Sequence, residues 1–141
     1  MSTLSQFFSS RPNALDFTVG NDRPYAGGIN ICYQGSGAGV LWVVSPFSSQ
    51  VSRTWYCRDD AVTRAQAVTG CTTWFVPTVS QLQNPGYCCR TLWDSFCSAL
   101  YWSSTECSAT TACGVYFSTG NVSNRFKNST CCVRAFRCVT Y

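Results

Sequence analysis

The order of the sequence patterns predicts one α+β domain. A helical pattern covers residues 60–69, a second helix is predicted to begin near residue 79, and strand patterns dominate from residue 100 onward. Helices grouped early and strands grouped late are typical of the α+β class. The chain has 141 residues, which is the length of about one domain. We therefore expect two short helices and a twisted antiparallel sheet, preceded by an extended N-terminal arm.

The predicted boundary divides the chain into an arm at residues 1–23 and a domain at residues 24–141. The arm is rich in Ser, Thr, Asn and Arg, and terminal segments fray unless something holds them. Its apolar side chains could pack on their own domain, or they could anchor the chain in a larger particle. The candidate anchors are Phe7, Phe8, Leu15 and Phe17.

A hairpin is predicted at the start of the domain. Residues 29–33 alternate between apolar and polar side chains, and residues 40–44 are continuously apolar, as in a buried strand. The glycine-rich residues 34–39 between them form the expected turn. No Gly-Lys-Ser/Thr triplet follows these glycines, so they do not form a phosphate-binding loop.

Two helices follow the hairpin in the prediction. Asp59 is placed to cap the helix at 60–69, and Gly70 stands where a left-handed residue commonly ends a helix. Thr78 and Gln81 have the spacing of a capping box for the second helix. The Asn-Pro-Gly sequence at 84–86 is expected to break that helix.

The rest of the domain is predicted to be mainly β. Residues 74–77 form a short expected strand that ends at a proline, whereas residues 87–99 have no clear pattern. We expect residues 114–117 and 132–138 to be strands of one sheet, with a turn at 118–121 between 114–117 and its returning partner. On the closing strand, Arg134 and Arg137 are expected to point to opposite faces.

The composition excludes several classes of function. The chain has no His, which removes the usual general base and the usual catalytic triads. It has one lysine and a net charge of only +4, which argues against a nucleic-acid partner. No apolar stretch has the length of a membrane span, about 18 residues. We expect no catalytic residue, no metal site and no cofactor, with Asp59 and Asp60 explained by their place at a helix start.

The chain contains eleven cysteines, an odd number that cannot all pair within one chain. The N-terminus has no signal-peptide pattern, so we expect synthesis in a reducing cytosol and mostly buried thiols. Cys131 and Cys138 are expected on opposite faces of the closing strand. The alternative is a set of bridges formed after release. One or two bridges are allowed for where Cys57 or Cys71 approaches the closing strand.

Four ordered blocks carry a family resemblance. They are WFVPTVSQL at 74–82, YWSSTE at 101–106, GVYFSTGNV at 114–122 and CVRAFR at 132–137. Over residues 25–141 the chain resembles the Lcl C-terminal, or DUF1566-type, domain, which is similar to the C-type-lectin-like and formylglycine-generating-enzyme superfamily. It departs from the family pattern at Gln81, where an acidic residue is usual, and in its many cysteines.

The resemblance implies a C-type-lectin-like fold in which the block residues are mainly structural. We expect Trp102 and the hydroxyls beside it to fix a buried turn, and Glu106 to pair with an Arg or to accept backbone N–H groups. A calcium role for Glu106 is the weaker alternative, because the lectin E-P-N and W-N-D motifs are missing. The residues assigned to the structural blocks are Trp74, Pro77, Trp102, Ser103, Ser104, Glu106, Arg134 and Arg137.

The resemblance also implies a function without catalysis. We expect a phage virion protein, either a capsid decoration or a tail or fibre component, that displays the lectin-like domain for attachment to a host surface or glycan. The arm would bind other virion proteins, and the chain would be a homo-oligomer or be present in many copies. The alternatives are an extracellular or cell-surface bacterial adhesin and, less expected for a short chain without His, a formylglycine-generating-type enzyme.

The polar segment at residues 118–130 contains the candidate ligand contacts. Its amide and basic side chains can form hydrogen bonds with sugar hydroxyls, although an ordinary solvated hairpin has the same composition. The candidates are Asn121, Asn124, Arg125, Lys127 and Asn128.

Overall fold

The computed structural model describes residues 22–23, 28–34 and 40–140, and it combines α-helices with two β-sheets. The α+β class is therefore confirmed. Most of the expected arm, with the candidate anchors Phe7, Phe8, Leu15 and Phe17, lies outside the described residues. The last two residues assigned to the arm form β1 (Asp22–Arg23), which pairs with the next strand. These two residues therefore belong to the sheet.

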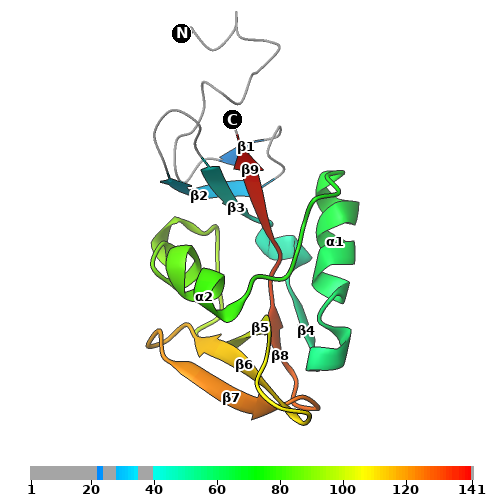
Figure 1. The fold of residues 1–141 in the computed structure, drawn as a ribbon. Coiled ribbons are helices and arrows are strands. Elements are labelled where there is room, and N and C mark those ends of the chain that lie inside the picture. Colours follow the sequence, from blue (N-terminus) through cyan, green and yellow to red (C-terminus); the bar gives the residue numbers. More distant parts are fainter. Residues whose placement is uncertain (1–21, 24–27, 35–39, 141) are drawn as a thin grey trace, which may run out of the picture.

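The first sheet confirms the predicted hairpin. It contains β1, β2 (Gly28–Gln34), β3 (Val40–Val44) and β9 (Phe136–Thr140), in the order β1-β2-β3-β9 (Figure 1). All of its pairs are antiparallel. Strand β3 is buried along most of its length, as its continuous apolar run predicts.

The second sheet has five strands in the order β4-β8-β5-β6-β7. Its pairs are antiparallel except for the parallel pair of β5 and β8, so the expectation of a single antiparallel sheet is wrong. The strand bounds are β4 (Val51–Arg53), β5 (Leu100–Glu106), β6 (Thr111–Tyr116), β7 (Val122–Phe126) and β8 (Cys131–Val133).

The closing segment divides between the two sheets, which corrects the expectation of one strand over 132–138. Strand β8 lies in the same sheet as β6, as expected, but β9 lies in the other sheet. Cys131 and Cys138 therefore lie on strands of different sheets rather than on two faces of one strand. Residues 131–136 are all buried, because this stretch passes through the interior between the sheets. Burial on every side removes the period-two pattern that would have marked the break.

Both helices begin where the sequence predicts, but only one is capped as expected. Helix α1 (Asp60–Thr69) ends at Gly70, whose φ of 77° is left-handed. The Asp59 side chain makes no capping hydrogen bond, while Asp60 binds Arg53 at 2.8 Å. Helix α2 (Val79–Gln81) has the complete capping box expected for its first turn. It continues into a wider turn, Leu82–Tyr87, that is interrupted at residues 84–85.

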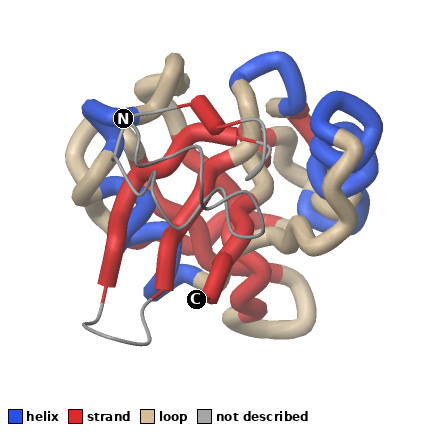
Figure 2. The backbone as a smooth tube through the Cα atoms, turned by 90° about the horizontal axis from the view of Figure 1, so that it is seen from above, coloured by secondary structure: helices blue, strands red, loops and turns tan. Residues whose placement is uncertain are grey.

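The expected strand at 74–77 is reduced to a single bridge between Phe75 and Phe136 of β9. Residues 88–99 are irregular apart from a 3₁₀ turn at Arg90–Leu92. Figures 1 and 2 agree that α1 and α2 flank the strands on opposite sides. No helix among the described residues is long and apolar enough to cross a membrane.

The interior contains an aromatic cluster under the irregular segment. Trp93 lies at its centre, with its ring centroid 5.0 Å from that of Phe117 and 5.8 Å from those of Tyr101 and Phe136. A second cluster around Trp55 and Trp102 lies toward α1. Because aromatic side chains bury large apolar areas, these clusters fix how the two sheets and the loops pack together.

Candidate ligand pocket

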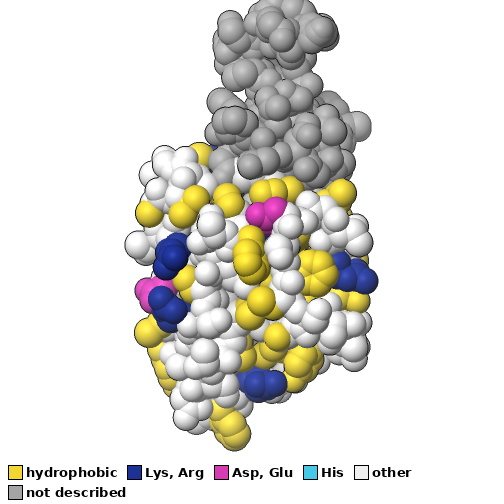
Figure 3. All heavy atoms as spheres, turned by 180° about the vertical axis from the view of Figure 1, so that it is seen from behind, with side chains coloured by type: hydrophobic (Ala, Val, Ile, Leu, Met, Phe, Trp, Pro, Cys, Tyr) yellow, Lys and Arg dark blue, Asp and Glu magenta, His cyan; other side chains and the backbone are white. Residues whose placement is uncertain are grey.

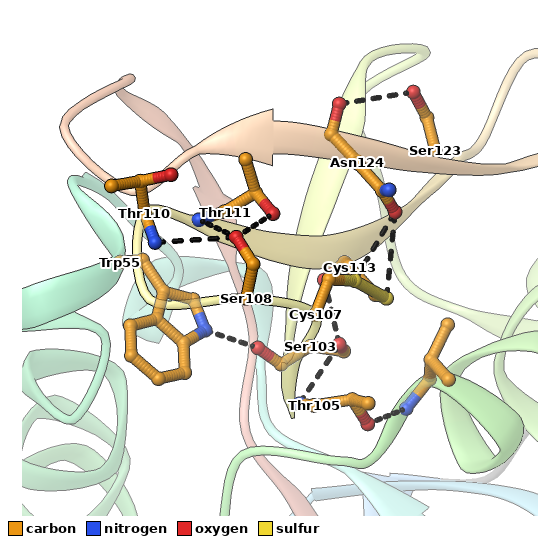
Figure 4. The surroundings of a disulfide bond; sticks show 11 residues. Trp55, Ser103, Thr105, Cys107, Ser108, Thr110, Thr111, Cys113, Ser123 and Asn124 are labelled. Carbon is orange, nitrogen blue, oxygen red and sulfur yellow. Dashed lines mark hydrogen bonds between the residues drawn. A yellow bond between two sulfur atoms is a disulfide. The ribbon is translucent and has the colours of Figure 1, made fainter.

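The YWSSTE block lies along β5 and not in a buried turn as expected. The β5–β6 pairing shifts register between Trp102 and Glu106, so the strand bulges there. Ser103 Oγ donates to the carbonyl oxygen of Cys113 at 2.6 Å, and Trp55 Nε1 donates to the carbonyl oxygen of Ser103 at 2.9 Å (Figure 4). These bonds hold β5 against β6 and against the turn before α1.

The same strand also binds the 74–82 block. The Ser104 amide donates to the carbonyl oxygen of Pro77 at 2.8 Å, and the Val79 amide donates to Thr105 Oγ1 at 2.9 Å. On the other side, Trp102 Nε1 donates to the carbonyl oxygen of Arg53 at 3.1 Å. The block residues therefore act as a frame that fixes β4, β5 and α2.

A disulfide between Cys107 and Cys113 closes the β5–β6 hairpin, with the two Cα atoms 5.9 Å apart. Asn124 Oδ1 lies 3.1 Å from Cys107 Sγ (Figure 4). All eleven cysteines lie in the described residues, and the other nine are free. The bridges allowed for at Cys57 or Cys71 are not formed, since both thiols are among the free cysteines.

Lys127 is buried, so it does not lie on the predicted ligand surface. Its side chain is 4% exposed and forms an ion pair with Glu106, and its Nζ also donates to the carbonyl oxygen of Ala109 at 3.0 Å. The ammonium group lies 4.7 Å from the ring centroid of Trp55. The candidate site must therefore be revised at Lys127, and the partner of Glu106 is a lysine rather than an arginine.

Arg134 lies where the chain crosses from β8 to β9, and it is also buried. Its Nε donates to the carbonyl oxygen of Ser45 at 2.7 Å, and Nη2 donates to Asp94 Oδ1 at 2.5 Å. Its Nη1 donates to the carbonyl oxygen of Ser95 at 2.8 Å and to Gln50 Oε1 at 3.2 Å. Burial lowers the pKa of Arg134, and the Asp94 carboxylate opposes that shift. This guanidinium is hydrogen-bonded to four residues that lie between β3 and β4 and in the loop before β5, so its role is structural.

Arg137 lies on β9, beside the expected structural block at Trp74. Its Nε donates to Thr73 Oγ1 at 2.7 Å, and its guanidinium lies 5.5 Å from the Trp74 ring centroid. Trp74 is itself buried and donates from Nε1 to Thr69 Oγ1 at 2.9 Å. These contacts connect the end of α1 to the four-stranded sheet.

A pocket of about 190 Å³ opens on the five-stranded sheet. Its lining combines polar groups, which are a guanidinium, a phenol and two hydroxyl groups, with apolar and thiol side chains. The lining includes Ser52, Leu100, Tyr116, Arg125, Thr130 and Cys132. Each of the five strands contributes at least one lining residue, so the pocket depends on the whole sheet.

Arg125 and Tyr116 form the polar wall of this pocket. Arg125 Nη2 donates to Tyr116 Oη at 2.7 Å, and the guanidinium lies 5.7 Å from the Tyr116 ring centroid. The hydrogen bond with Tyr116 raises the pKa of Arg125, which remains a cation. Arg125 is on β7, an edge strand, and is half-buried. It can therefore reach both the pocket and the solvent.

The structure does not bring the five predicted ligand residues together. Arg125 lines the pocket, whereas Asn124 points to the other face of β7, because side chains alternate along a strand. Asn121 and Asn128 are exposed beyond the two ends of that strand. The polar composition of the segment could not distinguish these positions.

The predicted ligand residues do not include Tyr116, Ser52 or Thr130, which line the pocket. For Tyr116 a signal was present, since the register of the 111–116 and 122–126 hairpin places it on the face of Arg125. Ser52 carries no such signal, because it reaches the pocket only through the pairing of β4 with β8.

Comparison with known proteins leaves the function to be argued from this geometry. A scan of protein-family models found no match, and a search of curated proteins found none either. The pocket at Arg125 and Tyr116 is therefore the feature on which a functional assignment can be built.

Proposed function

We propose that the chain is a non-enzymatic glycan-binding protein, carried by a phage particle as a capsid decoration or as a tail or fibre component. The pocket of Arg125 and Tyr116 is the observation that carries the binding role. An aromatic hydroxyl beside a guanidinium offers both apolar surface and directed hydrogen bonds, which is the combination that a sugar ring requires.

The size and charge of the pocket favour one sugar unit with an acidic group. Its volume of about 190 Å³ is smaller than the roughly 300–1,000 Å³ of pockets for drug-sized ligands. Arg125 supplies a planar cation that binds carboxylates through paired hydrogen bonds. The hydroxyls of Ser52 and Thr130 can then bind the neutral part of the ring.

Binding without turnover fits the chemistry of the described lining. It includes no carboxylate to exchange a proton with a substrate. The pocket thiols are poor nucleophiles, because burial raises the pKa of Cys131 and raises that of Cys132 to about 12. No group of three or more His, Cys, Asp or Glu side chains able to hold a metal occurs among the described residues.

The C-type-lectin-like resemblance and the low charge of the chain support display on a particle. The face seen in Figure 3 carries few charged side chains, which lie among uncharged and hydrophobic surface. Only 11% of the residues are charged, which gives weak electrostatic protection against association and suits a subunit of an assembly. The second candidate, an adhesin on a bacterial surface, uses the same pocket in a different setting.

Glycan binding is tested by titrating the full chain with acidic and neutral oligosaccharides. We expect uronic-acid-containing oligosaccharides to bind, and Arg125→Ala to weaken that binding at least ~10-fold, which corresponds to about 1.4 kcal/mol. Arg64→Ala is the matched control, because Arg64 is exposed on α1. The proposal fails if the wild type binds none of these sugars, or if both variants bind as the wild type does.

A separate experiment tests the carrier. We expect the chain to co-sediment in many copies with intact phage particles from a lysate. Recovery in the cell-surface fraction would replace the virion assignment with the adhesin, whatever the result of the sugar titration.

A further inference from the structure

Strand β7 lies at the edge of the five-stranded sheet. It pairs with β6 on its inner side, and among the described residues no strand pairs with it on the other side. Figure 1 shows β7 at the margin of the molecule, with β6 on one side and no labelled element on the other. Such an edge presents a row of backbone N–H and C=O groups that can bind another strand.

The hydrogen bonds with β6 determine which backbone groups of β7 face outward. The Lys127 amide, just after the strand, donates to the carbonyl oxygen of Thr110 at 2.9 Å, and the pairing continues without a shift through β7. Backbone groups of an antiparallel strand point alternately to its two sides, so the odd-numbered residues bind β6. The N–H and C=O groups of Val122, Asn124 and Phe126 therefore point to the open side.

The other edges in the described part of the chain are shorter or already occupied. Strand β1 has two residues, and β4 has three, with its Arg53 paired to Asp60 of α1. Strand β9 is bridged by Phe75 at its first residue. By contrast, β7 has five residues with no proline and no lysine, and it has no bulge. It therefore lacks the usual features that prevent an edge from pairing.

One face of β7 also exposes apolar side chains. Val122, Asn124 and Phe126 share this face, because side chains alternate along a strand. Val122 is 45% exposed and Phe126 is 65% exposed. Arg125 is the strand's one charged residue, and it points to the opposite face. The exposed face thus has two apolar groups with an uncharged polar group between them.

We propose that β7 pairs with β7 of a second copy of this chain, antiparallel and with the two Asn124 residues at a two-fold axis. In this register Val122 lies opposite Phe126 of the second copy, and Ser123 lies opposite its Arg125. The outward residues of the two strands then exchange backbone hydrogen bonds. The same surface meets itself, as a two-fold interface requires.

Charge and side-chain pairing favour this occupant and this register. A shift that brings Arg125 to the axis would place two guanidinium groups opposite each other, which destabilises a strand pair. A shift that brings Ser123 to the axis would leave Phe126 opposite no residue of the second β7. Only with Asn124 at the axis do both apolar residues meet an apolar partner while each arginine meets a hydroxyl. Aromatic and β-branched side chains form a favourable cross-strand pair.

The carbonyl oxygen of Phe126 already accepts one hydrogen bond, from the Ser129 amide at 2.9 Å. A carbonyl oxygen has a second lone pair, so this bond leaves room for the new strand. The dimer would join the two five-stranded sheets into one, with both Arg125–Tyr116 pockets on the same face. Two sugar-binding pockets per dimer rest on the proposed function, whereas the strand pairing does not.

Sedimentation equilibrium of the full chain, without any sugar, tests the pairing. The exposed thiols are alkylated beforehand, so that intermolecular disulfides do not contribute. We expect the mass to rise from the 15.5 kDa of one chain to twice that value between ~10 and ~300 µM, since one strand pair forms a small interface. A mass of one chain at every concentration overturns the proposal, as does a mass that rises beyond two chains, because a two-fold contact is closed.

Charge substitutions at the axis test the register. Asn124→Lys and Asn124→Asp each place like charges opposite each other and should weaken dimerisation at least ~5-fold. A mixture of the two variants should dimerise again, because an ammonium group then lies opposite a carboxylate. Asn128→Lys is the matched control, since Asn128 is exposed just beyond β7, and it should dimerise as the wild type does.

The proposal is wrong if both Asn124 variants dimerise as the wild type does, or if the mixture fails to recover. Phe126→Ser gives a second test in case position 124 is needed for folding, because Oδ1 of Asn124 lies 3.1 Å from Cys107 Sγ. This variant removes an exposed side chain and should also weaken dimerisation at least ~5-fold. Unchanged dimerisation of a folded Phe126→Ser protein would overturn the pairing through β7.

Discussion

The crossing between the two sheets and the edge strand β7 of the five-stranded sheet each contain an arginine, in opposite environments. Arg134 has a side chain that is 0% exposed and is hydrogen-bonded to four residues, whereas Arg125 is half-buried and binds the Tyr116 hydroxyl beside a pocket. A buried guanidinium must have its N–H groups satisfied by the protein. One at the surface can offer them to a ligand. The difference teaches that position relative to the sheets, rather than residue type, assigns an arginine to stability or to binding.

The largest expected effect comes from Arg134→Leu, which should lower the free energy of unfolding by ~3–5 kcal/mol. Removing the guanidinium leaves the carbonyl groups of Ser45 and Ser95 without their donor and removes the charge partner of Asp94. Urea denaturation measures the change. Arg125→Leu is the matched control and should change stability by no more than ~1 kcal/mol, since it loses only the hydrogen bond with Tyr116. Equal losses in the two variants would break the comparison.

Variants of the ion pair between the buried Lys127 and Glu106 should have intermediate effects on stability, and the two variants should differ in size of effect. Glu106→Gln should cost ~2 kcal/mol, because it leaves a buried ammonium group without its carboxylate. Lys127→Met should cost less, since the remaining Glu106 carboxylate is 57% exposed and can be hydrated. Denaturant unfolding of both variants measures the two losses in unfolding free energy. A larger loss for Lys127→Met would contradict the explanation that the cost comes from leaving a buried ammonium group unpaired.

The interior thiols predict a smaller, pH-dependent loss of stability. The pKa values of Cys89 and Cys132 rise from about 9 to about 11 and about 12 on folding, so the folded state binds these protons more tightly. Their contribution is complete below pH 9 and is lost as the pH rises through 11 and 12. Burial raises the pKa of Tyr101 as well, which adds to the loss.

Melting of the reduced protein between pH 8 and 11 measures this effect. We expect a steeper fall in Tm for the reduced wild type than for a protein with both Cys89 and Cys132 replaced by Ser. Parallel curves for the two proteins would show that these thiols do not cause the alkaline loss.

The smallest effect on stability is expected for Tyr116→Phe. The variant loses the hydroxyl that accepts from Arg125, a hydrogen bond worth ~1 kcal/mol or less at a half-exposed site. Under the proposed function, acidic-sugar affinity should fall about 2–5-fold while the Tm changes little. A large drop in Tm with unchanged affinity would show that Tyr116 stabilises the fold and does not contribute to ligand binding.

Local patterns predicted the elements well, because caps and left-handed glycines act within a few residues. Thr78, Gln81 and Gly70 are in the predicted roles. Contacts across the chain could not be predicted in the same way. Lys127 lies in a polar segment, and its burial depends on Glu106 and Trp55, which come from β5 and from the turn before α1. The pocket likewise depends on how strands that are distant in sequence become neighbours.

The division of residues 131–140 between the two sheets also sets an order for folding during synthesis. Strand β8 lies between β4 and β5, and β9 pairs with β3. Neither sheet can therefore be completed before this late segment is present. Pairing of distant segments raises the contact order and slows folding. A released chain that lacks this segment exposes the open edges of β3, β4 and β5. Occupancy by a chaperone should therefore be greater on a chain truncated just before residue 131 than on the full chain.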